Sequence, residues 1–293
     1  MHWPQIERTI RSAGHSSFAI ERVNPVSGGC IHQTYVIQDR HERFFVKLSS
    51  YRRSNVFVTE AHNLKALAAN GPVRVPQVIC QGEHQSGCFL VLEYLAMEAR
   101  DGGSDRRLGR QLALLHDVPH PDFGWFEDNY IGSTPQINGI HTDWVAFWRD
   151  CRLGFQLELA RNHGYDGWLQ RLGERVMAHM TSLFKAHRPD PSLLHGDLWA
   201  GNALALRSGE PVIFDPACYW GDREADLAMT ELFGGFSPDF YAAYHEIHPR
   251  QPGYEVRKQL YNLYHVLNHL NLFGRGYLGR AEEMMERLLV EIH

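Results

Sequence analysis

The feature that most constrains this 293-residue chain is a set of polar residues at fixed spacings between positions 195 and 215. Asn202 comes five residues after Asp197, and Asp215 follows thirteen residues later at the end of an apolar run. We expect short strands at 203–206 and 211–214, on either side of a turn at 208–209. The three polar side chains are therefore expected to converge on one site.

Two carboxylates and an amide in this pattern suit the transfer of a phosphoryl group. In kinases of the protein-kinase type, the first Asp accepts a proton from the attacking hydroxyl group. The Asn and the second Asp hold Mg²⁺ against the phosphates of ATP. We therefore predict that Asp197 is the catalytic base and that Asn202 and Asp215 are the metal ligands, because Mg²⁺ prefers oxygen ligands. The predicted cofactors are ATP and Mg²⁺.

Two further residues are expected to support this loop rather than to react. His195 precedes Asp197 by two residues and is expected to brace the loop through hydrogen bonds. Asp226 lies eleven residues after Asp215 and is interpreted as an acceptor for backbone N–H groups of the loop. An acidic residue placed at the start of a helix by the helix dipole is an equal alternative for Asp226.

A kinase of this type also needs a cation on the α- and β-phosphates. Lys47, in the apolar stretch Phe44–Leu48, is the candidate, and Glu60, near the start of the next expected helix, is its predicted ion-pair partner. A strand lysine without this context is usually a surface residue. The downstream Asp and Asn residues favour the nucleotide-binding interpretation.

A short glycine segment precedes the first predicted hairpin. Gly28 and Gly29 are placed where a loop over the phosphates is needed, because glycine lets backbone N–H groups approach an anion. A plain turn explains the pair as well. Cys30 follows, and a loop of this kind lowers the pKa of a thiol. Cys30 is thus a candidate redox-sensitive residue, with an inert buried cysteine as the alternative, and we predict a monomer or a redox-dependent homodimer.

Two other positions are assigned to ligand contacts. The apolar run Phe89–Tyr94 is typical of a strand that leads into a hinge, where backbone groups near Glu93 and Leu95 would bind the adenine edge. An ordinary core strand explains the same run. Trp199 lies two residues after Asp197, and an exposed indole there would form a flat wall for a sugar ring.

Composition excludes several classes of function. The net charge of −5 and the lack of a basic block argue against a nucleic-acid partner. No apolar run is long enough to predict a membrane span. Five scattered cysteines without paired spacing argue against a disulfide framework and suit a cytoplasmic location. Two histidine pairs at helical spacing, His245/His248 and His265/His269, are interpreted as packing or pocket residues rather than metal ligands.

Periodicity divides the chain into two parts. The first third reads as strands with one helix, and helical spacing dominates after residue 103, as in Leu108, Leu112 and Leu115. We predict an α+β, two-lobed protein-kinase-like fold with a small antiparallel β-rich lobe and a larger, mainly helical lobe. The expected boundaries are 1–94 for the nucleotide-binding lobe, 95–103 for the hinge and 104–293 for the catalytic and substrate-binding lobe.

The motifs around Asp197 and Asp215 resemble those of the fructosamine kinase (ketosamine-3-kinase) family, within the aminoglycoside-phosphotransferase-like kinases. Aminoglycoside and choline kinases share only the His-Gly-Asp, Asn and Asp skeleton. The Trp after Asp-Leu and the Asp-Pro-Ala and Tyr-Trp-Gly-Asp runs are closer to fructosamine kinases. The segments that carry the resemblance are 194–199, 201–202 and 214–224, with support from 28–29, 45–47, 59–61, 108–113, 128–132 and 148–153.

The resemblance implies ATP-dependent phosphorylation of the O3′ hydroxyl of a ketosamine, followed by loss of the sugar from the amine. Its substrate would be a free ketosamine or a glycated lysine of a protein. An aminoglycoside- or choline-type kinase is the alternative among enzymes. A non-catalytic nucleotide-binding module is the alternative outside them, and it would be expected to lack one of the residues Lys47, Asp197, Asn202 or Asp215, all of which are present.

Overall fold

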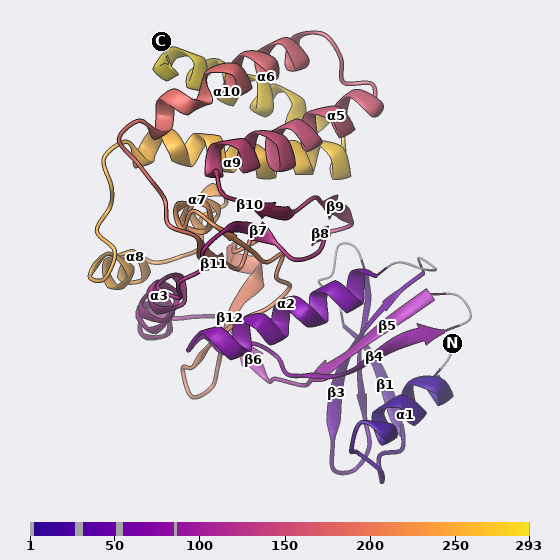
Figure 1. Cartoon of the computed structure of the whole chain (residues 1–293). Coiled ribbons are helices and arrows are strands. Elements are labelled where there is room, and N and C mark those ends of the chain that lie inside the picture. Colours follow the sequence, from indigo (N-terminus) through magenta and orange to yellow (C-terminus); the bar gives the residue numbers. More distant parts are fainter. Residues whose placement is uncertain (1–2, 27–31, 51–54, 85–86, 293) are drawn as a thin grey trace.

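A computed structural model describes residues 3–26, 32–50, 55–84 and 87–292 as two lobes (Figure 1). The smaller lobe holds an antiparallel sheet in the order β1-β2-β3-β5-β4 and two helices. Its elements are α1 (Trp3–Ser12), β1 (Arg22–Val26), β2 (Gln33–Gln38), β3 (Arg43–Ser49), α2 (Val56–Asn70), β4 (Val78–His84) and β5 (Gly87–Glu93). Gly28, Gly29 and Cys30 lie outside the described residues.

Strand β5 is the apolar centre of the small lobe. Because successive side chains of a strand point to opposite faces, Phe89 and Val91 join the core beneath α1, which includes Ile6 and Ile10. The alternate residues of β5, such as Leu90, join the core that α2 shares with the large lobe. The apolar run of β5 is therefore buried on both faces, and α1, which the sequence analysis did not predict, is the helix that covers one of them.

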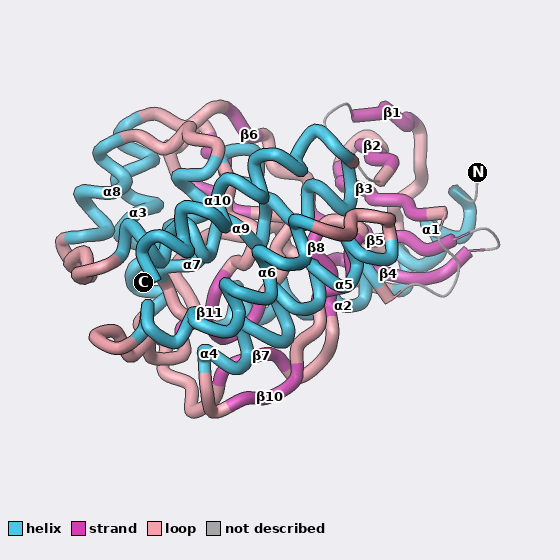
Figure 2. The backbone as a smooth tube through the Cα atoms, turned by 90° about the horizontal axis from the view of Figure 1, so that it is seen from above, coloured by secondary structure: helices cyan, strands magenta, loops and turns pink. Residues whose placement is uncertain are grey.

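The large lobe is mainly helical, and Figure 2 shows its helices packed side by side. Helix α9 runs through it and contacts α5, α7 and α10. The helices are α3 (Gly102–His116), α4 (Trp144–Phe147), α5 (Phe155–Asn162), α6 (Trp168–His179), α7 (Glu224–Leu232), α8 (Pro238–His245), α9 (Tyr254–Phe273) and α10 (Leu278–Ile292). None of the helices within the described ranges is both long and apolar enough to cross a membrane.

Short strands carry the loops of the large lobe. One sheet has the order β13-β12-β6, a second has the order β10-β7-β14-β11, and β8 pairs with β9. The strands are β6 (Met97–Glu98), β7 (Phe123–Trp125), β8 (Asn129–Ile131), β9 (Thr134–Gln136), β10 (Gly139–His141), β11 (Ser192–Leu194), β12 (Ala203–Leu206), β13 (Pro211–Ile213) and β14 (Tyr219–Gly221). The predicted hinge, 95–103, therefore contains β6, which pairs with β12 of the large lobe, and the first turn of α3.

The segment 144–161 is helical but does not form one regular α-helix. A π-helical segment, Trp148–Gly154, separates α4 from α5. This segment carries Arg152, whose side chain is fully buried and lies over the rings of Phe147 and Tyr219. The 3.6-residue periodicity of the sequence cannot reveal a wider turn of this kind, because π segments are rare and are held by tertiary contacts.

Candidate active site

The catalytic loop begins where β11 ends, and Gly196 sets its shape. Gly196 has φ +81°, and a Cβ atom at this position would lie 2.0 Å from the carbonyl oxygen of Ala217. Glycine is therefore required for both backbone conformation and space. The loop is tied to the segment after β13, because the N–H of Ala217 donates to the carbonyl of His195 at 2.8 Å.

Asp226, in the first turn of α7, lies beneath this loop. Its two carboxylate oxygens accept hydrogen bonds from the N–H groups of His195 and Gly196, at 2.7 and 2.8 Å. His116 Nε2 lies 3.3 Å from the same carboxylate. Burial acts to raise the pKa of Asp226, but His116, His195 and the backbone donors outweigh it and hold the pKa below its usual value. Asp226 is thus a buried, ionised acceptor for the loop.

His195 links the loop to the segment that carries Asp215. Its Nδ1 accepts from the N–H of Asp197 at 3.2 Å, and its Nε2 lies 3.0 Å from the carbonyl oxygen of Phe214. Burial lowers the pKa of His195. A neutral ring with the proton on Nε2 satisfies both contacts, so His195 holds backbone on two sides and is placed to brace rather than to react.

Asp197 is the least satisfied carboxylate of the site. Its Oδ2 accepts from Asn202 Nδ2 at 3.3 Å, and the same amide donates to the Asp197 carbonyl at 2.9 Å. Burial, and then the negative charge of Asp215, raises the pKa of Asp197 to about 7. Its side chain remains 21% exposed, which leaves it reachable by a substrate hydroxyl group.

Asp215 and Lys47 connect the two lobes. Lys47 Nζ lies 2.6 Å from Glu60 Oε1 and 2.6 Å from Asp215 Oδ1. Burial acts to lower the pKa of Lys47, but the two carboxylates outweigh it and raise the pKa, so the lysine is charged. Asp215 has φ +58°, a left-handed conformation that is uncommon for a residue other than glycine. The structure thus brings together residues from β3, α2 and the loop after β13.

The side chains of Asn202 and Asp215 fit a magnesium ion. An amide oxygen and a carboxylate are hard oxygen ligands of the kind that Mg²⁺ prefers. Because the Nδ2 group of Asn202 donates to Asp197, its Oδ1 is directed away from that residue. Asp215 is 47% exposed, so it can give up part of its contact with Lys47 to a bound cation.

The predicted adenine-binding residues lie at the end of β5. The N–H of Glu93 donates to the carbonyl of Gln77, and the Glu93 carboxylate accepts from Arg74 and from the N–H of Gln77. The backbone donor of Glu93 is therefore used within the small lobe. Leu95 lies two residues later and is half-buried, and its contact with adenine, like that of Glu93, stays a prediction.

Trp199 stands at the rim of the catalytic loop. Its side chain is 39% exposed, and its ring lies so close to Gly201 that a Cβ atom there would be 2.2 Å from the indole. Arg100 stabilises this segment from the predicted hinge, because its guanidinium group donates to the carbonyls of Ala203 and of Gly235. Sequence reasoning did not assign Arg100, since these two contacts lie more than 100 residues away.

Two histidines, one near Asp197 and one near Lys47 and Asp215, were not predicted as site residues. His265, on α9, is 3% exposed, and its Nδ1 lies 4.0 Å from Asp197 Oδ1 without a hydrogen-bond partner among the described residues. Burial lowers the pKa of His265 to about 3, so the ring is neutral. His32 precedes β2, and burial together with the charge of Lys47 lowers its pKa to about 4. Helical spacing identified His265 only as a packing or pocket residue.

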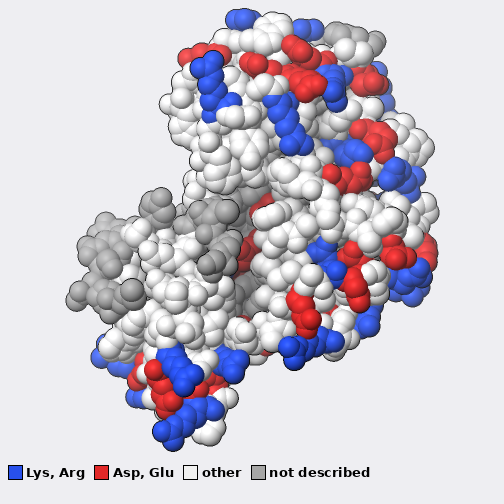
Figure 3. Space-filling view, turned by 180° about the vertical axis from the view of Figure 1, so that it is seen from behind, with Lys and Arg blue, Asp and Glu red and all other residues white. Residues whose placement is uncertain are grey.

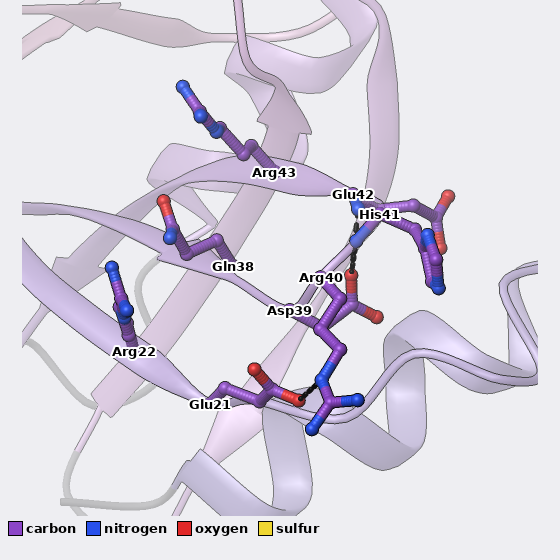
Figure 4. Close-up of a pocket in the computed structure, with 8 residues that line it drawn as sticks. All are labelled: Glu21, Arg22, Gln38, Asp39, Arg40, His41, Glu42 and Arg43. Carbon is purple, nitrogen blue, oxygen red and sulfur yellow. Dashed lines mark hydrogen bonds and ion pairs between the residues drawn. The ribbon is translucent and has the colours of Figure 1, made fainter.

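Figure 3 shows a hollow between the lobes with acidic side chains inside it. Two other groups of charged residues are separate from the residues described above. A separate cavity of about 300 Å³ lies around the β2–β3 turn, where Arg40 pairs with Glu21 and Asp39 accepts from backbone N–H groups of the turn (Figure 4). The buried group His187, Asp222 and Glu224 has ligand-like spacing. Arg257 forms two hydrogen bonds with Glu224, however, and so supplies the positive charge of that group.

Comparison with known sequences shows the family of this chain. A model of the family described as fructosamine kinase matches residues 2–291. A probable ketoamine kinase of Synechocystis sp. is 45% identical over 293 residues, which cover 98% of this chain and 97% of that protein. A chloroplastic protein-ribulosamine 3-kinase of Oryza sativa subsp. japonica is 41% identical over 273 residues, which cover 92% of this chain and 79% of that protein.

Solved structures agree with the two-lobed architecture. A crystal structure assigned to a fructosamine-3-kinase of Haemophilus somnus has a TM-score of 0.90 and 28% identity, and the match covers 98% of this chain and 97% of that one. An ADP-bound aminoglycoside phosphotransferase has a TM-score of 0.62 at 14% identity, over 97% of this chain and 98% of that one, which shows a shared fold alone. The predicted fold class and family resemblance are confirmed.

Proposed function

Because the chain belongs to the fructosamine kinase family, we propose that it phosphorylates the O3′ hydroxyl of ketosamines with Mg-ATP as donor. Ketosamines are the sugar adducts that form on amines by glycation. The observation that carries the proposal is the convergence of Asp197, Asn202, Asp215 and Lys47 from both lobes, with Lys47 held 2.6 Å from Asp215. A non-catalytic module has no need to keep an under-satisfied carboxylate beside this cluster.

The reaction follows from the positions of these groups. Asp197 accepts the proton of the sugar hydroxyl while that oxygen forms a bond to the γ-phosphorus of ATP. The bond between the γ-phosphorus and the bridging β–γ oxygen breaks, and ADP leaves. Lys47, held by Glu60, binds the α- and β-phosphates, and Asn202 and Asp215 would hold the magnesium ion that neutralises charge developing on the phosphates. Electrostatic placement supplies most of the rate enhancement.

The substrate side of the proposal rests on chemistry and charge. Trp199, exposed at the rim, would lie against the sugar. A phosphorylated ketosamine is unstable and loses the sugar, so the activity amounts to deglycation of a free amine or of a protein lysine. The net charge of −5 suits a substrate that carries a cationic amine.

The experiment that tests the proposal is a substrate panel. Ribulosamines, fructosamines, aminoglycosides and choline are each incubated with Mg-ATP, and ADP release is measured. Phosphorylation of ketosamines, with the phosphate mapped to O3′ by NMR, is the expected result. Turnover of aminoglycosides or choline alone would favour the alternative enzyme class. Binding of Mg-ATP in a thermal-shift assay without ADP release on any acceptor would favour a nucleotide-binding module.

The predictions for oligomeric state and location extend this proposal. We expect a monomer that forms a disulfide-linked dimer through Cys30 under oxidising conditions, in a cytoplasmic setting that ordinarily keeps it reduced. Non-reducing gels of the oxidised protein are expected to show a dimer that Cys30→Ser removes. Identical migration of the two proteins would reject a role for Cys30.

A further inference from the structure

We propose that an aromatic shelf beside the catalytic loop binds the organic group on the amine nitrogen of the substrate, so that the protein selects ketosamines by their amine as well as by their sugar. This inference rests on the function proposed above. The shelf consists of the side chains of Trp199, Phe233, His269, Phe273 and Tyr277.

The shelf is a continuous chain of ring contacts built from three parts of the large lobe. Trp199 comes from the catalytic loop, Phe233 from the end of α7, and the other three from the end of α9 and the turn that follows it. The centroid distances are 6.3 Å for Trp199–Phe233, 5.3 Å for Phe233–His269, 5.3 Å for His269–Phe273 and 5.1 Å for His269–Tyr277.

These rings are exposed to an extent that core packing does not explain. Trp199 is 39% exposed, Phe233 42% and Phe273 51%. They are three of the ten large apolar side chains that are exposed in the described part of the chain, and they meet at one place. A contiguous exposed apolar surface of this kind marks a binding site more often than scattered exposed residues do.

The shelf is continuous with the site of phosphoryl transfer. Trp199 follows Asp197 by two residues, and His269 lies one helical turn beyond His265, with its Nδ1 2.7 Å from the His265 carbonyl. His265 Nδ1 is buried and faces Asp197 without a partner in the described structure, which marks the place of a bound polar group. The proposal places the sugar here, with its amine end directed toward Trp199 and the rest of the shelf.

The chemistry of the amine end fits an aromatic surface. The nitrogen lies on C1 of the sugar, so C1 and C2 separate it from the reacting C3 position, and it is a protonated secondary amine at neutral pH. Aromatic faces attract such a cation and bury the carbon chain attached to it. Arg280 has its Cζ over the Phe233 ring, 5.9 Å from the ring centroid, and donates to the Leu232 carbonyl. One face of that ring is thus already covered by a cation. The shelf is therefore suited to an aliphatic or aromatic substituent.

The test compares ketosamines that share one sugar and differ only in the amine. Ribulose adducts of methylamine, benzylamine and Nα-acetyl-lysine are compared by kcat/KM. We expect the benzylamine and lysine adducts to exceed the methylamine adduct by roughly three- to tenfold in the native protein, the range of one favourable ring contact. Phe233→Ala and Phe273→Ala should bring this ratio toward one. Phe126→Ala, which removes a ring that is 65% exposed elsewhere, should leave the ratio as it is.

The outcomes separate the shelf from the proposed function. If no ribulose adduct is phosphorylated, the proposed function fails. If all three are phosphorylated with equal kcat/KM, or if the shelf variants lower all three in proportion, the function stands and the shelf is rejected. Phe233→Leu provides a second variant that keeps apolar volume, and it should also lower the ratio if the ring face is what binds the amine.

Discussion

Two regions around the catalytic loop shift the pKa of an aspartate in opposite directions. We call the buried side with Asp226 and His116 the floor, and the side with Asp197, Asn202 and Asp215 the reactive face. On the floor, Asp226 accepts two backbone hydrogen bonds and faces His116, and its pKa lies below the usual value. On the face, Asp197 has one long hydrogen bond from a side-chain amide, and its pKa is raised to about 7. Both residues are aspartates, so the difference in pKa comes from their environments and not from the side chain itself. The environment makes Asp226 a support for the loop and Asp197 a candidate base.

The difference shows how the fold divides stability from reactivity. Buried charges are tolerated when hydrogen bonds satisfy them, and the floor meets that condition. The face does not, because its acceptor oxygens are kept for a hydroxyl proton and a cation. A pair of acids whose environments push their pKa values apart is the pattern expected of a support and a base.

The largest expected effect is on kcat, from a substitution on the reactive face that leaves the floor intact. Asp197→Asn removes the proton acceptor and should lower kcat by about 10² to 10⁴-fold, the contribution of a general base, while nucleotide affinity is retained. ADP release and calorimetric titration of an ATP analogue measure the two quantities. Asp166→Asn, an exposed acid in the loop between α5 and α6, is the control. Near-native kcat in Asp197→Asn would contradict the assignment of the base.

The second largest expected effect is a loss of stability when Asp226, on the floor, is replaced. Asp226→Asn leaves one acceptor for two backbone donors and removes the charge facing His116, so the free energy of unfolding should fall by about 3 kcal/mol. Urea denaturation measures the loss, and kcat should fall as well because the loop loses its anchor. A variant with native stability would show that Asp226 does not support the loop.

The pH dependence of stability should have opposite signs for the two acids. The pKa of Asp197 is raised from 3.8 to about 7 in the folded protein, so the folded state binds more protons in that window, and its contribution to stability falls as pH rises from about 4 to 7. Asp226 has a lowered pKa, so its contribution is present above 3.8 and is lost as pH falls.

Unfolding free energies of the native protein and both Asn variants, measured from pH 4 to 8, test these signs. The native protein should lose stability relative to Asp197→Asn as the pH rises. It should gain stability relative to Asp226→Asn over the lowest part of the range. Parallel curves for all three proteins would refute the comparison.

The smallest expected effect concerns His265, an unsatisfied group on the reactive face. His265→Leu removes a buried nitrogen that has no partner in the described structure, so thermal stability should be unchanged or slightly higher. If the nitrogen binds the acceptor sugar, KM for the ketosamine should rise roughly three- to tenfold, the value of one neutral hydrogen bond. KM for ATP should not change. An unaltered acceptor KM would place His265 outside the substrate site.

The sequence by itself determined the family, the two-lobed fold class and the set of candidate residues around Asp197. It could do so because the spacing of acid and amide is local, and because β5 and α3 carry uninterrupted apolar patterns. Signals were also present but not used: Ile6 and Ile10, four residues apart, mark the buried face of α1. The catalytic roles, the domain boundaries and the glycine loop stay predictions.

Only the tertiary structure decided which groups meet across long separations. Lys47 pairs with Asp215 over 168 residues, Arg100 reaches the Gly235 carbonyl over 135, and His265 faces the loop residue Asp197 from helix α9. The physical reason is that local patterns specify helices and strands, whereas burial and hydrogen-bond satisfaction are properties of the packed chain. The aromatic shelf also depends on the tertiary structure, because its rings come from three segments that are far apart in the sequence.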